Sequence, residues 1–151
     1  MSRIWIYQSK HKLSPSEKES ITSETTDFIN RWAAHNVKLD ARFEIKDDRF
    51  IILSVNEQAV LASGCSIDDS VRFMQDLDKK YNLSLFDRLQ MAYLDANGEV
   101  QVSGLNDIDK LYESGEIKDN TLVFDNTIQD SNQLSNSWKV PFAESGFAVL
   151  K

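Results

Sequence analysis

The sequence predicts an α+β fold in which a mostly antiparallel sheet carries two long helices on one face. Three observations support this prediction. Short apolar or alternating runs are typical of strands, and two longer segments carry apolar residues at helical spacing. The elements follow one another in the order β-α-β-β-α-β and then β-α-β. The first six match a ferredoxin-like core, and the last three form a C-terminal extension of it.

The N-terminal part of the chain predicts one strand and one helix. Residues 3–8 include four consecutive apolar or aromatic side chains, which is typical of a central strand. Ser14–Glu17 reads Ser-Pro-Ser-Glu, a helix start in which the first serine can cap, the proline suits the first helical position and the glutamate completes a capping box. Apolar residues continue at helical spacing to Trp32. The helix is expected to end near residues 34–36, where Asn36 can take the left-handed conformation that ends a helix.

The middle of the chain predicts a hairpin followed by a second long helix. Residues 41–45 and 49–55 flank a short polar turn, and the second run is apolar on both faces, which favours an interior strand. Ser66, with an acidic residue three positions later, gives a second capping pattern, and the helix runs to Tyr81. Residues 60–62 are ambiguous, because as a short strand they would leave only a general α+β class.

The rest of the chain predicts two further strands, a short helix and a last strand. Residues 89–94 and 99–103 flank Asp-Ala-Asn-Gly, which is a strong turn signal. A short helix follows and is stopped by Gly115, and residues 121–124 form the last strand. Residues 125–151 are expected to form an irregular tail docked on a single α+β domain that spans residues 1–151.

Composition limits the classes of function. The chain has 151 residues, with 17 basic and 24 acidic side chains and a net charge of −7, which disfavours nucleic acids and anionic membranes as partners. Its single cysteine excludes an internal disulfide and fits a reducing compartment. The N-terminus becomes polar by Gln8, so it does not predict a signal peptide. No apolar run approaches the roughly 20 residues of a membrane helix. We therefore expect a cytoplasmic protein.

Cys65 is the most suggestive position for chemistry. It lies where a helix is expected to begin, and unpaired N–H groups together with the helix dipole stabilise a thiolate there. Gly64 would allow close approach of a ligand to the backbone, and Ser66 adds a hydroxyl group beside it. His35 is the candidate base of a Cys–His pair. The alternatives are a small buried cysteine and a histidine placed at a helix end by the dipole.

Other candidate sites are less specific. Trp138 and Phe142 could form a docking or dimer anchor in the tail, because exposed aromatic side chains often mark interfaces. Paired carboxylates such as Asp47-Asp48 and Asp68-Asp69 are typical of solvated turns and caps in an acidic chain. No metal site is predicted, because two isolated histidines and one cysteine lack ligand spacing. No cofactor is predicted either, since the five glycines form neither a phosphate loop nor a dinucleotide fingerprint.

Five segments carry a resemblance to known proteins. They are Arg3–Gln8, Trp32–His35, Arg49–Leu53, Ser63–Asp68 and Trp138–Pro141. With these segments, nearly the whole chain resembles a family of small uncharacterised bacterial proteins that are often labelled ABC transporter ATPase. The resemblance implies a bacterial protein of unknown activity. ATP hydrolysis is not expected, because the Gly-Lys-Ser/Thr of a phosphate loop is missing.

Three hypotheses about function remain open. The first is a non-catalytic cytoplasmic domain that binds a protein or small-molecule partner, with an exposed apolar patch around Trp138–Phe147, a buried Cys65 and a possible homodimer. The second is a thiol-dependent enzyme or redox sensor, which needs an accessible Cys65 beside a pocket and His35 as a possible base. The third is a carboxylate-metal enzyme, which needs three or more acidic side chains that converge.

Overall fold

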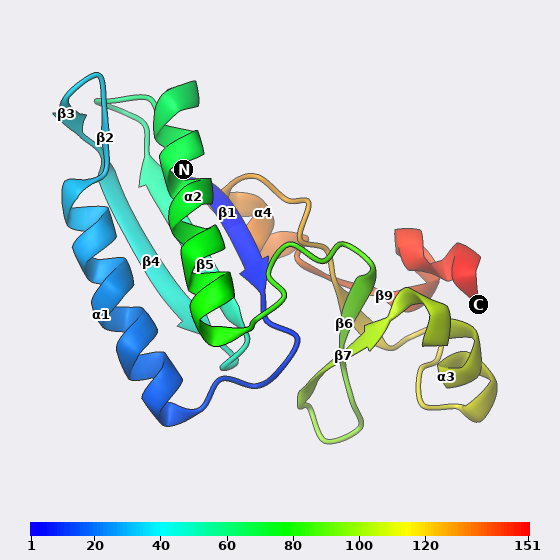
Figure 1. Cartoon of the computed structure of the whole chain (residues 1–151). Coiled ribbons are helices and arrows are strands. Elements are labelled where there is room, and N and C mark those ends of the chain that lie inside the picture. The colour runs from blue at the N-terminus through cyan, green and yellow to red at the C-terminus, as the bar shows by residue number, and fades with distance from the viewer. The chain divides into compact units, whose positions relative to one another are not determined.

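The computed structural model describes residues 1–151 and shows helices and antiparallel sheets (Figure 1), which confirms the α+β class. The chain forms two compact units. Unit 1 comprises Met1–Phe86 and Gln129–Asn132, and unit 2 comprises Asp87–Ile128 and Gln133–Lys151. None of the helices is both long and apolar enough to cross a membrane.

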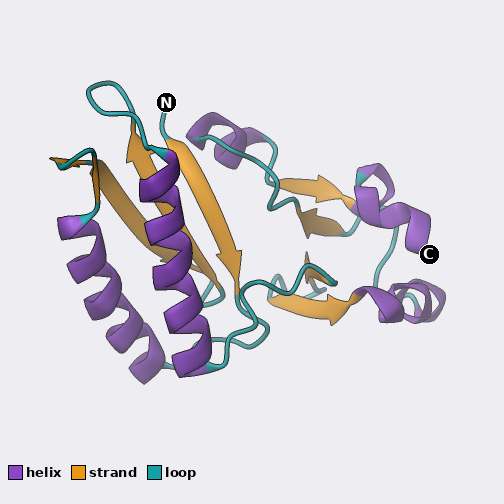
Figure 2. Cartoon of the chain, turned by 45° about the horizontal axis from the view of Figure 1, so that its top comes forward, coloured by secondary structure: helices purple, strands orange, loops and turns teal.

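Unit 1 is a three-stranded antiparallel sheet in the order β1-β5-β4, with two helices packed against one face (Figure 2). The central strand is β5, which pairs with β1 on one side and with β4 on the other. A two-stranded hairpin of β2 and β3 precedes β4. The elements of this unit are β1 (Arg3–Gln8), α1 (Pro15–Arg31), β2 (Ala33–Ala34), β3 (Val37–Lys38), β4 (Asp40–Lys46), β5 (Phe50–Asn56) and α2 (Gly64–Tyr81).

The core of unit 1 lies between the helices and the sheet. Ile51 and Leu53 point from β5 toward the helices and are fully buried, together with Ile21 of α1 and with Met74 and Leu77 of α2. Complete burial of a side chain of this size stabilises a fold by about 1.5–3 kcal/mol. The helices are therefore held to the sheet by their apolar faces.

The first helix begins as predicted and ends earlier. Ser14 Oγ accepts a hydrogen bond from Glu17 N–H at 3.1 Å, and a Glu17 carboxylate oxygen accepts one from Ser14 N–H at 2.9 Å, which is the predicted capping box. The helix ends at Arg31, so the expected end at residues 34–36 is wrong. His35 and Asn36 have φ values of 51° and 63°. These left-handed residues form the tight turn of the β2–β3 hairpin.

The N-cap of the second helix lies three residues before the predicted one. It is Ser63, whose Oγ accepts a hydrogen bond from Ser66 N–H at 3.1 Å. Gly64 and Cys65 consequently lie inside the first turn of α2, and Ser66 is a buried residue of the helix. Residues 60–62, which the sequence left ambiguous, form no strand.

The expected fourth strand of a ferredoxin-like sheet lies in a different sheet, so that topology is wrong for this chain. β6 joins the sheet of unit 2, in the order β7-β6-β8-β9. In unit 1, residues 129–130 instead lie beside the start of β1: Ile4 N–H donates to Gln129 O at 2.9 Å, and Arg3 forms an isolated bridge with Asp130. The strands of the unit 2 sheet are β6 (Gln90–Leu94), β7 (Val100–Gly104), β8 (Leu122–Phe124) and β9 (Lys139–Pro141).

The C-terminal segment is more regular than the irregular tail predicted for residues 125–151. It contains α4 (Ser131–Asn136), strand β9 and two 3₁₀ helices, at Phe142–Glu144 and Gly146–Leu150. β9 pairs with β8 at the edge of the sheet, where a proline at its end is tolerated. The remaining helix of unit 2 is α3 (Ile108–Ser114), preceded by a 3₁₀ turn at Leu105–Asp107.

Candidate functional site

The predicted thiol site lies at one end of unit 1. The β2–β3 hairpin and the start of α2 lie at the same end of this unit (Figure 1). Trp32, which follows α1, donates a buried hydrogen bond from its indole Nε1 to Ser66 O at 2.7 Å. This bond fixes the segment before the hairpin to the first turn of α2.

Cys65 is an exposed free thiol. The first hypothesis expected it to be buried, and that expectation is wrong. The reason is the shifted cap: with Ser63 as N-cap, the side chain of Ser66 turns inward and that of Cys65 turns outward. At Gly64, an added Cβ would meet no atom within 4 Å. No close backbone approach therefore requires a glycine at this position.

His35 does not form a pair with Cys65. It lies at the exposed tip of the β2–β3 hairpin, and no hydrogen bond joins the two side chains. Its predicted place at the end of a helix is wrong, because α1 has already ended at Arg31. The structure brings the two residues to the same end of unit 1 without assembling them as nucleophile and base.

Three predicted binding residues are buried and contact other residues of the chain instead of a ligand. Ser66 is buried and its hydroxyl donates to Ser63 O at 2.7 Å. Trp138 is buried against Phe124, with ring centroids 4.8 Å apart, and its Nε1 donates to Asn126 Oδ1 at 2.9 Å. Phe142 is fully buried in the core of unit 2. The aromatic patch expected at Trp138 and Phe142 is therefore not exposed.

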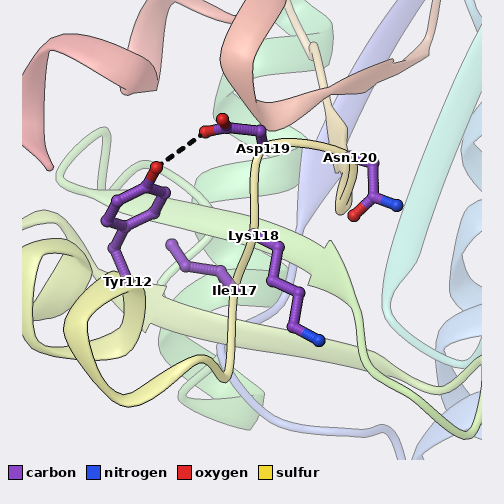
Figure 3. A pocket seen from close by; sticks show the side chains of 5 residues that line it. All are labelled: Tyr112, Ile117, Lys118, Asp119 and Asn120. Carbon is purple, nitrogen blue, oxygen red and sulfur yellow. Dashed lines mark hydrogen bonds between the residues drawn. The ribbon is translucent and has the colours of Figure 1, made fainter.

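Unit 2 contains a hollow of about 470 Å³ at the surface (Figure 3). It lies between the end of α3 and the loop that leads into β8. Gly115 ends α3 with a φ of 81°, a conformation that glycine adopts without steric cost. The residues that line the hollow are Tyr112, Ile117, Lys118, Asp119 and Asn120.

Backbone hydrogen bonds on both sides fix the loop of this hollow. Ile117 N–H donates to Leu111 O at 3.1 Å, which ties the loop to α3. Ala143 N–H donates to Asp119 O at 3.0 Å, and Phe142 N–H donates to Thr121 O at 2.7 Å. The loop is thus held by segments that precede and follow it in the sequence, so the hollow is formed before any ligand arrives.

Two side chains of the hollow are hydrogen-bonded to each other, and two others have no hydrogen-bond partner within the chain. Tyr112 O–H donates to Asp119 Oδ1 at 2.9 Å, and Figure 3 shows the two side chains pointing toward one another. Lys151 Nζ lies 3.6 Å from the same carboxylate and 5.0 Å from the centroid of the Tyr112 ring. Lys118 and Asn120 are exposed, and their side chains form no hydrogen bond or ion pair within the chain. Figure 3 shows the Lys118 and Asn120 side chains across the loop from the Tyr112 ring. The hollow therefore offers unused hydrogen-bond donors on one side and an aromatic ring on the other.

Sequence reasoning missed this hollow. The run Gly115–Asn120 indicated only a loop, and the bond from Ala143 to Asp119 joins residues far apart in the chain.

The carboxylate-metal hypothesis finds no matching group of side chains, because no three His, Cys, Asp or Glu side chains are placed to hold a metal ion.

An electrostatic cluster lies between the two long helices. Tyr81 O–H donates to a carboxylate oxygen of Glu24, and Lys80 Nζ lies 2.9 Å from the other oxygen. The hydrogen bond from Tyr81, together with Lys80, lowers the pKa of Glu24, and the same hydrogen bond raises the pKa of Tyr81. The Glu24 carboxylate accepts a hydrogen bond from Tyr81 and pairs with Lys80. The cluster therefore connects α1 to α2, and each of its three charged or polar groups has a partner.

Comparisons with known proteins assign this chain to no family. No protein-family model matches it, and no curated protein or solved structure does so. The resemblance to small bacterial proteins therefore stays a prediction from the five sequence segments.

Proposed function

We propose that this protein is a non-catalytic, cytoplasmic domain that binds a small anionic ligand in the hollow of unit 2. The observation that carries the proposal is the hollow itself, whose loop is fixed on both sides by backbone hydrogen bonds. The hollow is open to solvent rather than enclosed, and its volume of about 470 Å³ falls in the range of small-molecule sites. A fixed loop lowers the entropy cost of binding.

The available side chains indicate the chemistry of the ligand. Lys118 supplies a cationic donor and Asn120 an amide, and both suit a carboxylate or phosphate group. The ring of Tyr112 supplies a flat apolar wall. Asp119 would repel an anion, but its carboxylate already accepts from Tyr112 and pairs with Lys151. A small molecule with an anionic group and a planar or aliphatic part fits these features.

The test is a titration of the full chain with phenyl phosphate and benzoate, followed by amide chemical shifts. We expect shifts concentrated at residues 112–121, and a loss of affinity of about tenfold in Lys118→Glu, in which the cationic donor becomes an anion. Lys110→Glu makes the same charge change at an exposed position of α3 and should leave the affinity unchanged. Equal losses in the two variants, or shifts scattered over the chain, would contradict the proposal.

Thiol chemistry is the second candidate, and the exposure of Cys65 at the first turn of α2 favours it. The deciding measurement is the pH dependence of alkylation by iodoacetamide in the folded protein. A midpoint well below the ordinary thiol value of about 8.5 would support an activated thiolate. A midpoint at or above that value would leave a surface cysteine without thiol chemistry, and binding in the hollow would remain the proposed function.

A further inference from the structure

The two edges of the unit 1 sheet differ in how they are covered. The start of β1 is paired with residues 129–130 of the same chain. β4, the strand at the other edge, pairs with β5 along its whole length and has no strand on its outer side. It contains no proline and no residue with positive φ. Of the features that protect exposed edges it has charged side chains, at four of its seven positions, so a pairing strand must carry complementary charges. β4 is therefore open to another strand.

The outer backbone groups of β4 belong to Ala41, Phe43 and Ile45. Ser9 N–H donates to Arg49 O at 2.8 Å, which continues the β1–β5 register by one pair. Bonded and non-bonded pairs alternate in an antiparallel ladder, so the odd-numbered residues of β5 bond to β1 and the even-numbered residues bond to β4. In β4 the even-numbered residues therefore face β5, and the odd-numbered residues direct their N–H and C=O groups outward.

The charges of β4 are complementary to a second copy of the same strand. The sequence of residues 40–46 is Asp-Ala-Arg-Phe-Glu-Ile-Lys. In an antiparallel pair centred on Phe43, Arg42 lies opposite Glu44 of the second copy, and the two-fold axis repeats this pair. Asp40 and Lys46 lie opposite each other at the strand ends by the same symmetry. Arg42 and Glu44 are exposed and have no ion-pair partner within the chain, so the inference rests on this central pair.

Among the registers that overlap at least five residues of β4, only this one places opposite charges opposite each other at every charged position. A shift by four residues also pairs Arg42 with Asp40, or Glu44 with Lys46, but it overlaps only three residues. A shift by one residue would pair inward-facing with outward-facing backbone groups, so no ladder could form. A shift by two residues in one direction places Arg42 opposite Arg42 and Asp40 opposite Glu44. In the other direction it places Glu44 opposite Glu44. Like charges directly opposite each other destabilise a strand pair, so the centred register is selected.

Helix α1 leaves room for a neighbour beside this edge. Glu24 faces α2 through its bonds to Lys80 and Tyr81. At 100° per residue, Thr22 and Thr26 lie on the opposite flank of α1, above the outer side of β4. Both are exposed, short and uncharged, and the Thr26 hydroxyl is turned back onto Thr22 O at 2.7 Å. At these two residues the flanks can approach each other without burying a charge, and Lys18, which lies on the same flank, is paired with Asp48 at 2.7 Å.

We propose that two copies of this chain associate through β4, forming a continuous six-stranded antiparallel sheet about a two-fold axis at Phe43. This interface is separate from the hollow of unit 2 and does not depend on its function. One strand pair and two helix flanks make a surface smaller than the roughly 1,600 Å² of a standard interface. We therefore expect an equilibrium between monomer and dimer rather than a permanent dimer.

The test is sedimentation equilibrium of the full chain and of charge-reversed variants. Arg42→Glu and Glu44→Arg should each weaken the dimer by about tenfold or more, because each places two like-charge pairs in the interface. An equimolar mixture of the two variants should regain the wild-type affinity, since every central pair is then of opposite sign. Arg88→Glu, at an exposed position of unit 2, should have no effect. A wild-type protein that stays monomeric at about 1 mM, or a mixture no tighter than its components, would overturn the proposal.

Amide hydrogen exchange distinguishes β4 pairing from any other dimer. The amides of Arg42 and Glu44 bond to β5 in the monomer and should be protected at every concentration. The amides of Ala41, Phe43 and Ile45 face outward and should gain protection only as the dimer forms. A dimer in which these three amides still exchange freely would show that another surface is used.

Discussion

At the scale of single residues, the contact of Glu24 with Tyr81 has a defined pH dependence. The Glu24 carboxylate accepts from the Tyr81 hydroxyl, which lowers the pKa of Glu24 from its ordinary value of 4.5. A group with a lowered pKa contributes stability above its unfolded value, and this contribution is lost as the pH falls through its folded value. The pKa of Tyr81 is raised from 10.0. The contribution of the tyrosine is therefore present below pH 10 and is lost as the pH rises through its folded value.

Tyr81→Phe should reduce the free energy of unfolding by about 0.5–1 kcal/mol at pH 7, a modest value because the contact is partly exposed. The difference from wild type should shrink as the pH falls below 4.5 and through the lowered pKa of the wild-type Glu24, because protonation removes the carboxylate that accepts from Tyr81. Urea unfolding at pH 7 and pH 3 measures the difference. A difference that is the same at both pH values would show that the variant acts through packing rather than through the carboxylate.

At the scale of elements, the start of α1 depends on residues that are adjacent in the sequence. Ser14 and Glu17 exchange hydrogen bonds between side chain and backbone, and the proline between them occupies the first helical position. Because all three lie within one turn, the helix start depends on this local pattern alone.

Ser14→Ala should lower the free energy of unfolding by about 1 kcal/mol, because one helical N–H loses its acceptor. Ser16→Ala is the matched control: its hydroxyl contacts only Ser14 Oγ at the surface, so we expect a change below about 0.5 kcal/mol. Urea unfolding at pH 7 compares the two variants. If both serines contributed equally, the capping box would not be what stabilises the start of α1.

The elements that the sequence mispredicted depend on distant residues. The end of α1 was predicted too late. The helix ends at Arg31, and the next residue, Trp32, donates a hydrogen bond to Ser66 O, a partner that the local sequence does not reveal. The left-handed preference of Asn36 was recognised, but it serves a hairpin turn rather than a helix end. β6 was assigned to the first sheet because its own pattern specifies a strand and not its partner. The hollow was missed for the same reason, since Asp119 is fixed by Ala143.

At the scale of the whole molecule, unit 1 is discontinuous in sequence. Residues 129–132 belong to it and bond to the start of β1: Ser131 N–H donates to Ser2 O at 2.8 Å, and Ser131 Oγ accepts from Ser2 N–H at 2.9 Å. A short segment from the last third of the chain therefore lies at one edge of the unit 1 sheet.

Ser131→Pro tests this arrangement in the full chain. Ser131 is the first residue of α4, where proline is well tolerated, but the variant loses both bonds to Ser2. We expect faster amide exchange at Ile4, whose N–H donates to Gln129 O, while amides in the centre of β5 keep their protection. Ser131→Ala removes only the hydroxyl and should have a smaller effect. Unchanged exchange at Ile4 would mean that residues 129–132 are held by other contacts.

The late position of residues 129–132 has a consequence for biosynthesis. The strands and helices of unit 1 are complete once Tyr81 has been made, yet the segment that bonds to the start of β1 follows only after residues 87–128. At about 5–20 residues per second, this leaves that strand edge uncovered on the ribosome for several seconds. During this interval the nascent chain presents two open strand edges instead of one. Contact with chaperones, or with a neighbouring nascent copy, is then most favoured.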